Sequence, residues 1–279
     1  MSEWRVLDLF SGIGGFSLGL SRAGMHPSRF CEIDERCRTI LAARFPGIAI
    51  SGDVRQCVFE CGEADIIVGG FPCQDVSLAG KRAGITGARS GLYREVLRAI
   101  RLVRPKFALL ENVAALLGFG VGVVLGNVAE DGLDAEWDCI SVGELGAPHG
   151  RDRIWIAVAD PNQLKRALRR HSGVGWWFWR PEEVEASRNA DGKWELEPPR
   201  LLGNVRRWVN DAANSGTWWS DQWQEKFEAL RRMDDGIPSR LDRSLVAAAL
   251  KCLGNALAPQ IPEIWGRAII QAEAERVKA

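Results

Sequence analysis

Short apolar runs alternate with stretches of helical spacing through the first 160 residues of the chain. The runs have the length of strands, and glycine-rich or polar turns separate them from the helical stretches. Because such an alternation builds parallel sheets covered by helices, it predicts an α/β fold, with a mostly parallel twisted sheet and helices on both faces. The predicted strands are Arg5–Phe10, a strand ending at Glu32, Ala64–Gly69, Lys106–Glu111, Trp137–Val142 and Arg153–Val158, and the predicted helices are Phe16–Ala23, Glu35–Phe45 and Leu92–Val103.

The pattern changes after Asp160. Eight of the twelve tryptophans lie between Trp176 and Trp223, in a stretch with poor helical periodicity and several turn signals. Helical spacing returns over Leu241–Leu253, before Gly-Asn-Ala and a second helical stretch. We therefore predict a small, irregular domain over residues 161–236, between residues 1–160 and residues 237–279.

Charge is balanced over the whole chain but not locally. Lys plus Arg and Asp plus Glu both number 36, so the net charge neither favours nor excludes a polyanionic partner. Residues 74–106, however, contain eight basic and two acidic side chains, a net charge of +6. A solvated helix face explains part of this charge, namely the arginines of residues 94–104. Lys81, Arg82 and Arg89 stand in a glycine-rich loop, where contact with phosphates explains them better.

The seven cysteines and the N-terminus limit the class of protein further. The cysteine count is odd and no C-x-x-C pair occurs, so neither a disulfide framework nor a zinc site is predicted, and no metal is expected. The first residues lack a signal peptide and no apolar run reaches the length of a membrane span. We expect a cytoplasmic protein with reduced thiols and no membrane partner.

A glycine turn and two acidic residues suggest a nucleotide-like ligand. In residues 8–16, Asp-Leu-Phe-Ser-Gly-Ile-Gly-Gly-Phe, a strand runs through a tight turn into a helix, which lets such a ligand approach backbone N–H groups. Glu32 ends the second strand about 20 residues later, where a ribose-binding carboxylate belongs. Asp53, in Ser-Gly-Asp-Val, is suited to accept from an adenine amino group. Each carboxylate taken alone would be better explained as a helix cap or a surface charge.

Two further residues carry candidate chemistry. Cys73 follows a strand and Pro72 at the start of the basic loop, and such a loop mouth suits a reactive thiol better than a structural one. Glu111 ends the next strand, in Leu-Leu-Glu-Asn-Val. In a parallel sheet both residues would lie at the carboxyl edge, where ligands bind.

With these motifs the chain resembles the DNA (cytosine-5) methyltransferases. The resemblance covers residues 5–160 and about 237–270, and it rests on the order and spacing of Phe10-Ser-Gly-Ile-Gly-Gly, Phe71-Pro-Cys-Gln, Glu111-Asn-Val, Arg151-x-Arg153 and Gly254-Asn-Ala. It implies a Rossmann-like domain dependent on S-adenosyl-L-methionine (AdoMet), formed by residues 1–160 and the returning segment 237–279. Residues 161–236 would be the target recognition domain.

The resemblance also implies a mechanism. Cys73 would add to C6 of a cytosine flipped out of duplex DNA, which makes C5 nucleophilic toward the methyl group of AdoMet. Glu111 would act at N3, which requires a raised carboxyl pKa. Arg153 would hold O2 of the base, and Arg151 would support the site.

The same resemblance assigns the binding residues. Phe10 would lie near the sulfonium, because a cation over an aromatic face is attracted, and Ile33 would pack on the adenine. The expected AdoMet residues are Phe10, Gly12, Gly14, Glu32, Ile33, Asp53, Leu92 and Asn255. The expected DNA contacts are Gln74, Ser77, Lys81, Arg82 and Arg89.

Several points stay open on the sequence. His149 stands where the family usually has Gln, either as a hydrogen-bonding substitute or as a change in loop packing or pH dependence. A tRNA cytosine-5 methyltransferase and a silent AdoMet-binding DNA-recognition protein are the alternatives to an active DNA enzyme. The expected partner is double-stranded DNA, with a restriction endonuclease as a functional but not a physical partner. We expect a monomer associated with the nucleoid of a bacterial or phage-infected cell.

Overall fold

A computed structural model describes residues 3–72, 92–145, 150–160, 187–188, 194–195, 209 and 257–277. Most of the predicted inserted domain and the predicted helix over residues 241–253 lie outside these ranges, so the two domain boundaries, at 160/161 and 236/237, remain predictions. In the described part no helix is long and apolar enough to cross a membrane.

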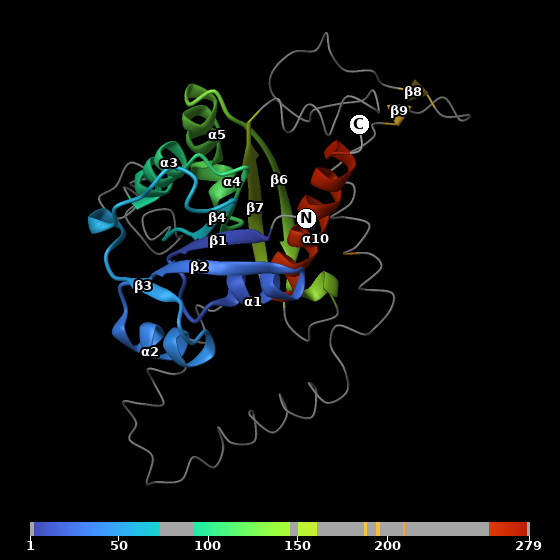
Figure 1. Ribbon diagram of the computed structural model, residues 1–279. Helices are drawn as coiled ribbons and strands as arrows, with labels where there is room; N and C mark the ends of the chain where they lie inside the picture. The colour runs from blue at the N-terminus through green and yellow to red at the C-terminus, as the bar shows by residue number, and fades with distance from the viewer. Residues whose placement is uncertain are drawn as a thin grey trace.

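The described chain is built around a seven-stranded sheet with the order β3-β2-β1-β4-β5-β7-β6 (Figure 1). The first five strands in sequence pair in parallel, and β7 runs antiparallel between β5 and β6. The prediction of a mostly parallel sheet is therefore confirmed, with one strand reversed. The strands are β1 (Trp4–Leu9), β2 (Met25–Cys31), β3 (Ala49–Ser51), β4 (Ile66–Gly70), β5 (Phe107–Val113), β6 (Asp134–Ser141) and β7 (Asp152–Ala159), and a separate two-stranded pair joins β8 (Ser187–Arg188) to β9 (Trp194–Glu195).

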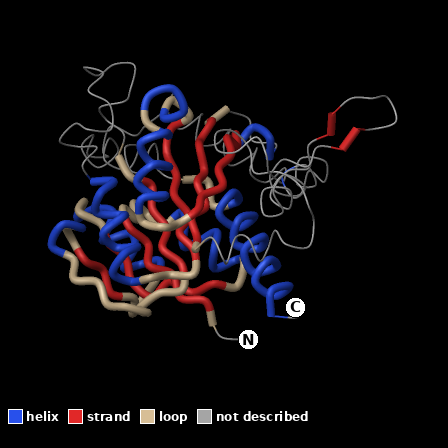
Figure 2. Tube along the Cα trace, turned by 90° about the horizontal axis from the view of Figure 1, so that it is seen from above, coloured by secondary structure: helices blue, strands red, loops and turns tan. Residues whose placement is uncertain are grey.

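Helices cover both faces of this sheet, as the sequence predicts (Figure 2). They are α1 (Gly15–Arg22), α2 (Glu35–Arg44), α3 (Leu92–Val103), α4 (Leu116–Phe119), α5 (Val121–Glu130) and α10 (Gln260–Val277), with short 3-10 turns η1 (Val54–Gln56) and η3 (Val142–Leu145). Alternate strand residues enter opposite cores. Val6 and Ile66 pack with α1 and α10, whereas Leu7 and Ile67 pack with α3 and α5.

Helix α10 lies along α1, although about 240 residues separate their starts in the sequence (Figure 1). The two helices approach closely because a glycine stands at the contact. A Cβ atom on Gly19 would lie 2.1 Å from the carbonyl oxygen of Pro259. The buried Glu263 of α10 adds ion pairs to Arg22 at 3.8 Å and to Arg267 at 2.8 Å. The C-terminal helix is thus part of the layer that supports the glycine turn before α1.

Candidate active site at the carboxyl edge of the sheet

The turn between β1 and α1 adopts left-handed backbone conformations. Phe10 has a φ of +53°, and Gly12 and Gly14 have φ values of +53° and +85°, with Gly14 as the N-cap of α1. The sequence pattern placed Phe10 inside the strand, which is wrong, because the strand ends at Leu9. A bulky residue in this region costs on the order of 1–3 kcal/mol, and such residues cluster at functional sites.

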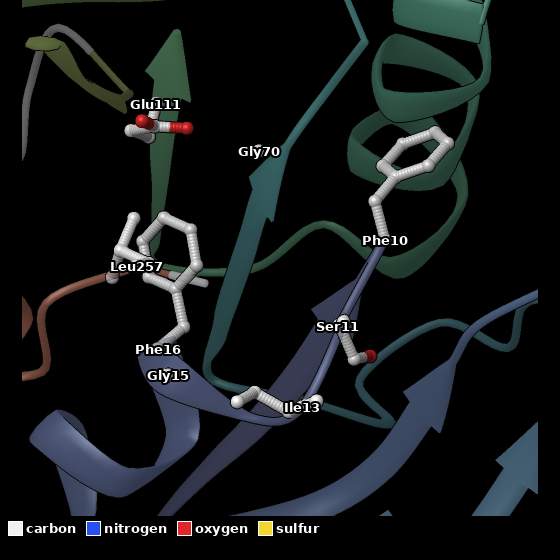
Figure 3. Close-up of a pocket in the computed structure, with 9 residues that line it drawn as sticks. Phe10, Ser11, Ile13, Gly15, Phe16, Gly70, Glu111 and Leu257 are labelled. Atoms are coloured by element: carbon white, nitrogen blue, oxygen red, sulfur yellow. The ribbon is translucent and has the colours of Figure 1, made fainter. Parts of the chain in front are cut away.

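A pocket opens beside this turn. Its walls are the turn itself, Gly70 at the end of β4, Glu111 on β5, and Leu257 before α10. Figure 3 shows Phe16 and Leu257 together beneath the carboxyl group of Glu111. The expected AdoMet residues Phe10 and Gly12 line this pocket. Sequence reasoning missed Leu257, although its apolar position directly after Gly254-Asn-Ala was a usable signal.

A buried carboxyl group lies at the base of the turn. Asp8 is fully buried, and its Oδ2 accepts hydrogen bonds from the hydroxyl of Ser17 at 2.6 Å and from its backbone N–H at 3.3 Å. Within the described part of the chain its Oδ1 has no hydrogen-bond partner. Burial, reinforced by the nearby Glu32, raises the pKa of Asp8 to about 7, although the bonds from Ser17 oppose this. Asp8 therefore takes up a proton near neutral pH.

The raised pKa of Asp8 predicts a loss of stability with rising pH. A folded-state pKa above the ordinary 3.8 means that the native state binds the proton more tightly, so this stability is complete below pH 3.8 and disappears as pH passes 7. Between pH 5 and pH 8 the free energy of unfolding should fall by about 2–3 kcal/mol more in the wild type than in Asp8→Asn. Urea unfolding of both proteins at the two pH values measures this, and parallel pH profiles would refute it.

Glu32 connects the end of β2 to the glycine turn. Its Oε2 accepts from the backbone N–H of Gly12 at 2.7 Å, and its Oε1 accepts from that of Asp34 at 2.8 Å. A carboxylate has about four acceptor positions, so capacity remains for ribose hydroxyls. The neighbouring Ile33 is 65% exposed and offers apolar surface beside that carboxylate.

Asp53 caps the 3-10 turn η1. Its Oδ1 accepts from the backbone N–H of Arg55 at 3.0 Å, and its carboxylate also pairs with the guanidinium of Arg55. The hydrogen bonds from Arg55 lower the pKa of Asp53. The helix-cap interpretation describes its observed conformation, while its contact with an adenine amino group remains a prediction. Leu92, also expected near AdoMet, begins α3 and packs against the core.

Glu111 and Arg153 form an ion pair above the pocket. Arg153 Nε lies 2.8 Å from Glu111 Oε1, because β7 runs beside β5 and brings the two side chains together. On the other side a Cβ atom at Gly70 would lie 2.8 Å from Glu111 Oε2, so only glycine leaves room for this carboxyl group (Figure 3). Burial raises the pKa of Glu111, and the charges of Arg153 and Arg151 only partly oppose it.

Arg151 lies at the edge of the same cluster. Its backbone N–H donates to the hydroxyl of Ser141 at 3.4 Å. Burial, and then the positive charge of Arg153, lower the pKa of its guanidinium, whereas Glu111 raises it. Arg151, Arg153 and Glu111 are therefore electrostatically coupled.

Asn112 lies next to Glu111 on β5, and the sequence motifs assigned it no role of its own. It is buried, and its Nδ2 donates to the carbonyl oxygen of Phe71 at 2.9 Å, while its Oδ1 accepts from the N–H of Val113 at 2.8 Å. Phe71 stands two residues before Cys73. Asn112 therefore fixes the point where the chain leaves β4 toward the expected nucleophile. A polar residue inside an apolar strand was the available signal.

Several expected site residues lie outside the described residues: Cys73, Gln74, Ser77, Lys81, Arg82, Arg89, His149 and Asn255. Their roles remain predictions. Among the side chains that the structure does describe, no group of three or more His, Cys, Asp or Glu is arranged to hold a metal ion.

Known proteins that are similar to this chain include several methyltransferases. "Type II methyltransferase M2.BsuMI" of Bacillus subtilis is 35% identical over 224 residues, 72% of this chain and 56% of the relative. "Type II methyltransferase M.CviJI" of Paramecium bursaria Chlorella virus IL3A is 32% identical, covering 72% of this chain and 52% of the relative. A solved Entamoeba histolytica methyltransferase, EhMeth, has a TM-score of 0.48 at 19% identity, over 57% of this chain and 53% of its own.

The chain thus spans about half the length of these curated relatives. The C-5 cytosine-specific DNA methylase family matches residues 4–239, most of the sequence and all of the sheet. The chain belongs to the family of C-5 cytosine-specific DNA methylases.

Proposed function

We propose that this chain is an AdoMet-dependent DNA (cytosine-5) methyltransferase. It transfers a methyl group to C5 of a cytosine flipped out of a specific duplex sequence, through a covalent bond between Cys73 and C6, and releases S-adenosyl-L-homocysteine. The observation that carries the proposal is the Glu111–Arg153 pair, which lies beside the glycine turn and next to the strand end that leads to Cys73. In this proposal one edge of the sheet carries the acid Glu111, the cation Arg153, the nucleophile Cys73 and the glycine turn that binds the cofactor.

The pocket residues suit AdoMet, which supplies an electrophilic methyl group when bound. Phe10 is held in a strained conformation at the pocket wall, where an aromatic face attracts a sulfonium. Glu32 retains acceptor capacity for ribose hydroxyls, and Ile33 offers apolar surface to the adenine. Gly14, Asp53, Leu92 and Asn255 complete the proposed set.

The protein residues divide the work of the reaction. The Cys73 thiolate adds to C6, which moves electron density onto C5, and Glu111 donates a proton or hydrogen bond at N3. After methyl transfer C5 loses its proton and Cys73 leaves, so the aromatic ring is restored. Arg153 holds O2 of the base. Its Nε contacts Glu111 and its Nη1 donates to the carbonyl oxygen of Asp152, so about three of its five N–H donors have no partner among the described residues.

Entry of the base is expected to change the Glu111–Arg153 pair. As Arg153 turns toward O2, Glu111 loses part of its nearest positive charge inside a buried site. Its pKa, already raised by burial, rises further, which keeps the carboxyl group protonated at N3. Before the base arrives, the ion pair favours the charged form of Glu111. After Arg153 has turned away, burial favours the protonated form.

Residues outside the catalytic cluster would bind the duplex. Residues 161–236 would recognise the target, and Gln74, Ser77, Lys81, Arg82 and Arg89 would contact phosphates and bases and offset the flipping cost of roughly a few kcal/mol. Residues 1–160 and 237–279 would form the catalytic domain. The chain would act as a monomer on cytoplasmic, nucleoid-associated DNA, with a restriction endonuclease as a functional partner, in line with the "Type II" names of its relatives.

Methyl transfer from labelled AdoMet to unmethylated duplex DNA, followed by bisulfite sequencing, tests the proposal. We expect conversion-resistant cytosines in one sequence context, which also gives the recognition site. Label in tRNA but not in DNA would move the substrate to tRNA. AdoMet binding with no label in either nucleic acid would indicate a silent recognition protein.

A further inference from the structure

The turn that carries Asp53 has little support from the sheet. It follows β3, which has only three residues and, within the described part of the chain, pairs with β2 alone. Two buried thiols contact its carbonyl groups: Cys31 Sγ lies 3.3 Å from the oxygen of Gly52, and Cys57 Sγ lies 3.5 Å from the oxygen of Asp53. Because thiols are weak donors, these contacts alone hold the turn poorly.

Arg98 of α3 supplies the strong donors. Its Nη2 donates to the carbonyl oxygen of Val54 at 2.8 Å and its Nη1 to that of Cys57 at 3.1 Å, so the guanidinium spans η1 from its first residue to its C-cap. Its Nε donates to Glu95 at 2.7 Å, and its Cζ lies over the ring of Phe59, 4.8 Å from the ring centroid. Every nitrogen of the side chain is therefore used, and its orientation is fixed.

Arg101, three residues later on the same helix, shows what an ordinary surface arginine does here. It pairs with Asp131 at 2.8 Å, is 55% exposed, and donates to no group of the turn. Exposed pairs of this kind contribute little to stability. Arg98 is 33% exposed and donates to two main-chain carbonyls of another segment, where the planar fork of arginine cannot be replaced by a lysine ammonium.

We infer that Arg98 is a positioning residue for Asp53 and thereby for the adenine end of AdoMet. The inference rests on the proposed function, which assigns Asp53 to the adenine amino group. Arg98 ties the Asp53 turn to α3, the helix whose first residue, Leu92, is also proposed to contact AdoMet. One guanidinium thus sets the spacing between two segments that are proposed to contact AdoMet.

The test compares Arg98→Lys with the matched control Arg101→Lys. Both keep the charge, and both stand on the same helix. Arg98→Lys should raise KM for AdoMet about tenfold with kcat changed less than about twofold, because charged hydrogen bonds to the turn are lost while the reacting groups are untouched. Arg101→Lys should leave both constants unchanged. Equal constants in the two variants would overturn the inference.

A double-mutant cycle with Asp53→Asn shows whether Arg98 acts through Asp53. Asn keeps the cap of η1 but loses the charge. If Arg98 positions Asp53, then Arg98→Lys should change KM far less in the Asp53→Asn background, whereas additive effects would overturn the inference. Glu95→Gln weakens the hold on Arg98 without removing it, so its KM for AdoMet should lie between those of the wild type and Arg98→Lys. This variant replaces Arg98→Lys in the test if Arg98→Lys does not fold. If the wild-type protein binds no AdoMet, both the proposed function and this inference are wrong. If the wild type binds AdoMet normally but the effects of Arg98→Lys and Asp53→Asn on KM are additive, only the inference is wrong.

Discussion

Replacing Cys73 by serine should lower methyl transfer by more than about 10³-fold while leaving AdoMet binding within about twofold of the wild type. A serine hydroxyl is hardly ionised near neutral pH, whereas a thiol forms a useful fraction of thiolate. The cofactor residues of the β1–α1 turn belong to other elements and are not altered. Single-turnover methylation of duplex DNA measures the first effect, and calorimetric titration with AdoMet measures the second.

The chain supplies a matched control for this experiment. Cys61 is an exposed free cysteine, so Cys61→Ser makes the same chemical change outside the site. It should methylate DNA at the wild-type rate. A Cys73→Ser protein that turned over at a rate comparable with Cys61→Ser would rule out the covalent mechanism.

Glu111→Gln should lower the single-turnover rate by about 10²–10⁴-fold, because the amide cannot transfer a proton at N3. The pH dependence gives a second signature. Burial raises the pKa of Glu111, so the protonated form persists to higher pH than for an ordinary glutamate. The wild-type rate should fall as pH rises through that pKa, while the residual rate of Glu111→Gln should lack this step.

Glu130→Gln provides the control for Glu111→Gln, since Glu130 is exposed at the end of α5, away from the pocket. Its rate and pH profile should match those of the wild type. Equal single-turnover rates in Glu111→Gln and Glu130→Gln would remove Glu111 from its proposed role.

The sequence pattern predicted the elements best where burial is one-sided. Helix α3 begins and ends at the predicted residues because Val96, Leu97 and Ile100 form a clear apolar stripe. Helix α5 had no such signal. Its sequence contains Gly122 and Gly126, which favour loops, and it is helical here because tertiary packing buries Val124 and Val128.

The site was predictable as a set of residues but not as a set of contacts. Glu111 and Arg153 were both named from motifs, yet their ion pair depends on β7 running antiparallel to β5, and the periodicity does not reveal strand direction. The buried carboxyl group of Asp8 and the bond from Asn112 to Phe71 were missed for a related reason. Polar side chains inside apolar runs show their partners only after the strands are paired.

The packing of α10 on α1 also has a consequence for biosynthesis. The apolar side chains of Phe16 and Leu20 are covered by Ile264 and Trp265, which the ribosome adds about a hundred residues after β7. At translation rates of roughly 5–20 residues per second, the apolar face of α1 therefore stays uncovered by α10 for on the order of ten seconds after β7 is complete. A chain that stops within the intervening residues keeps that face exposed, which makes it prone to aggregation.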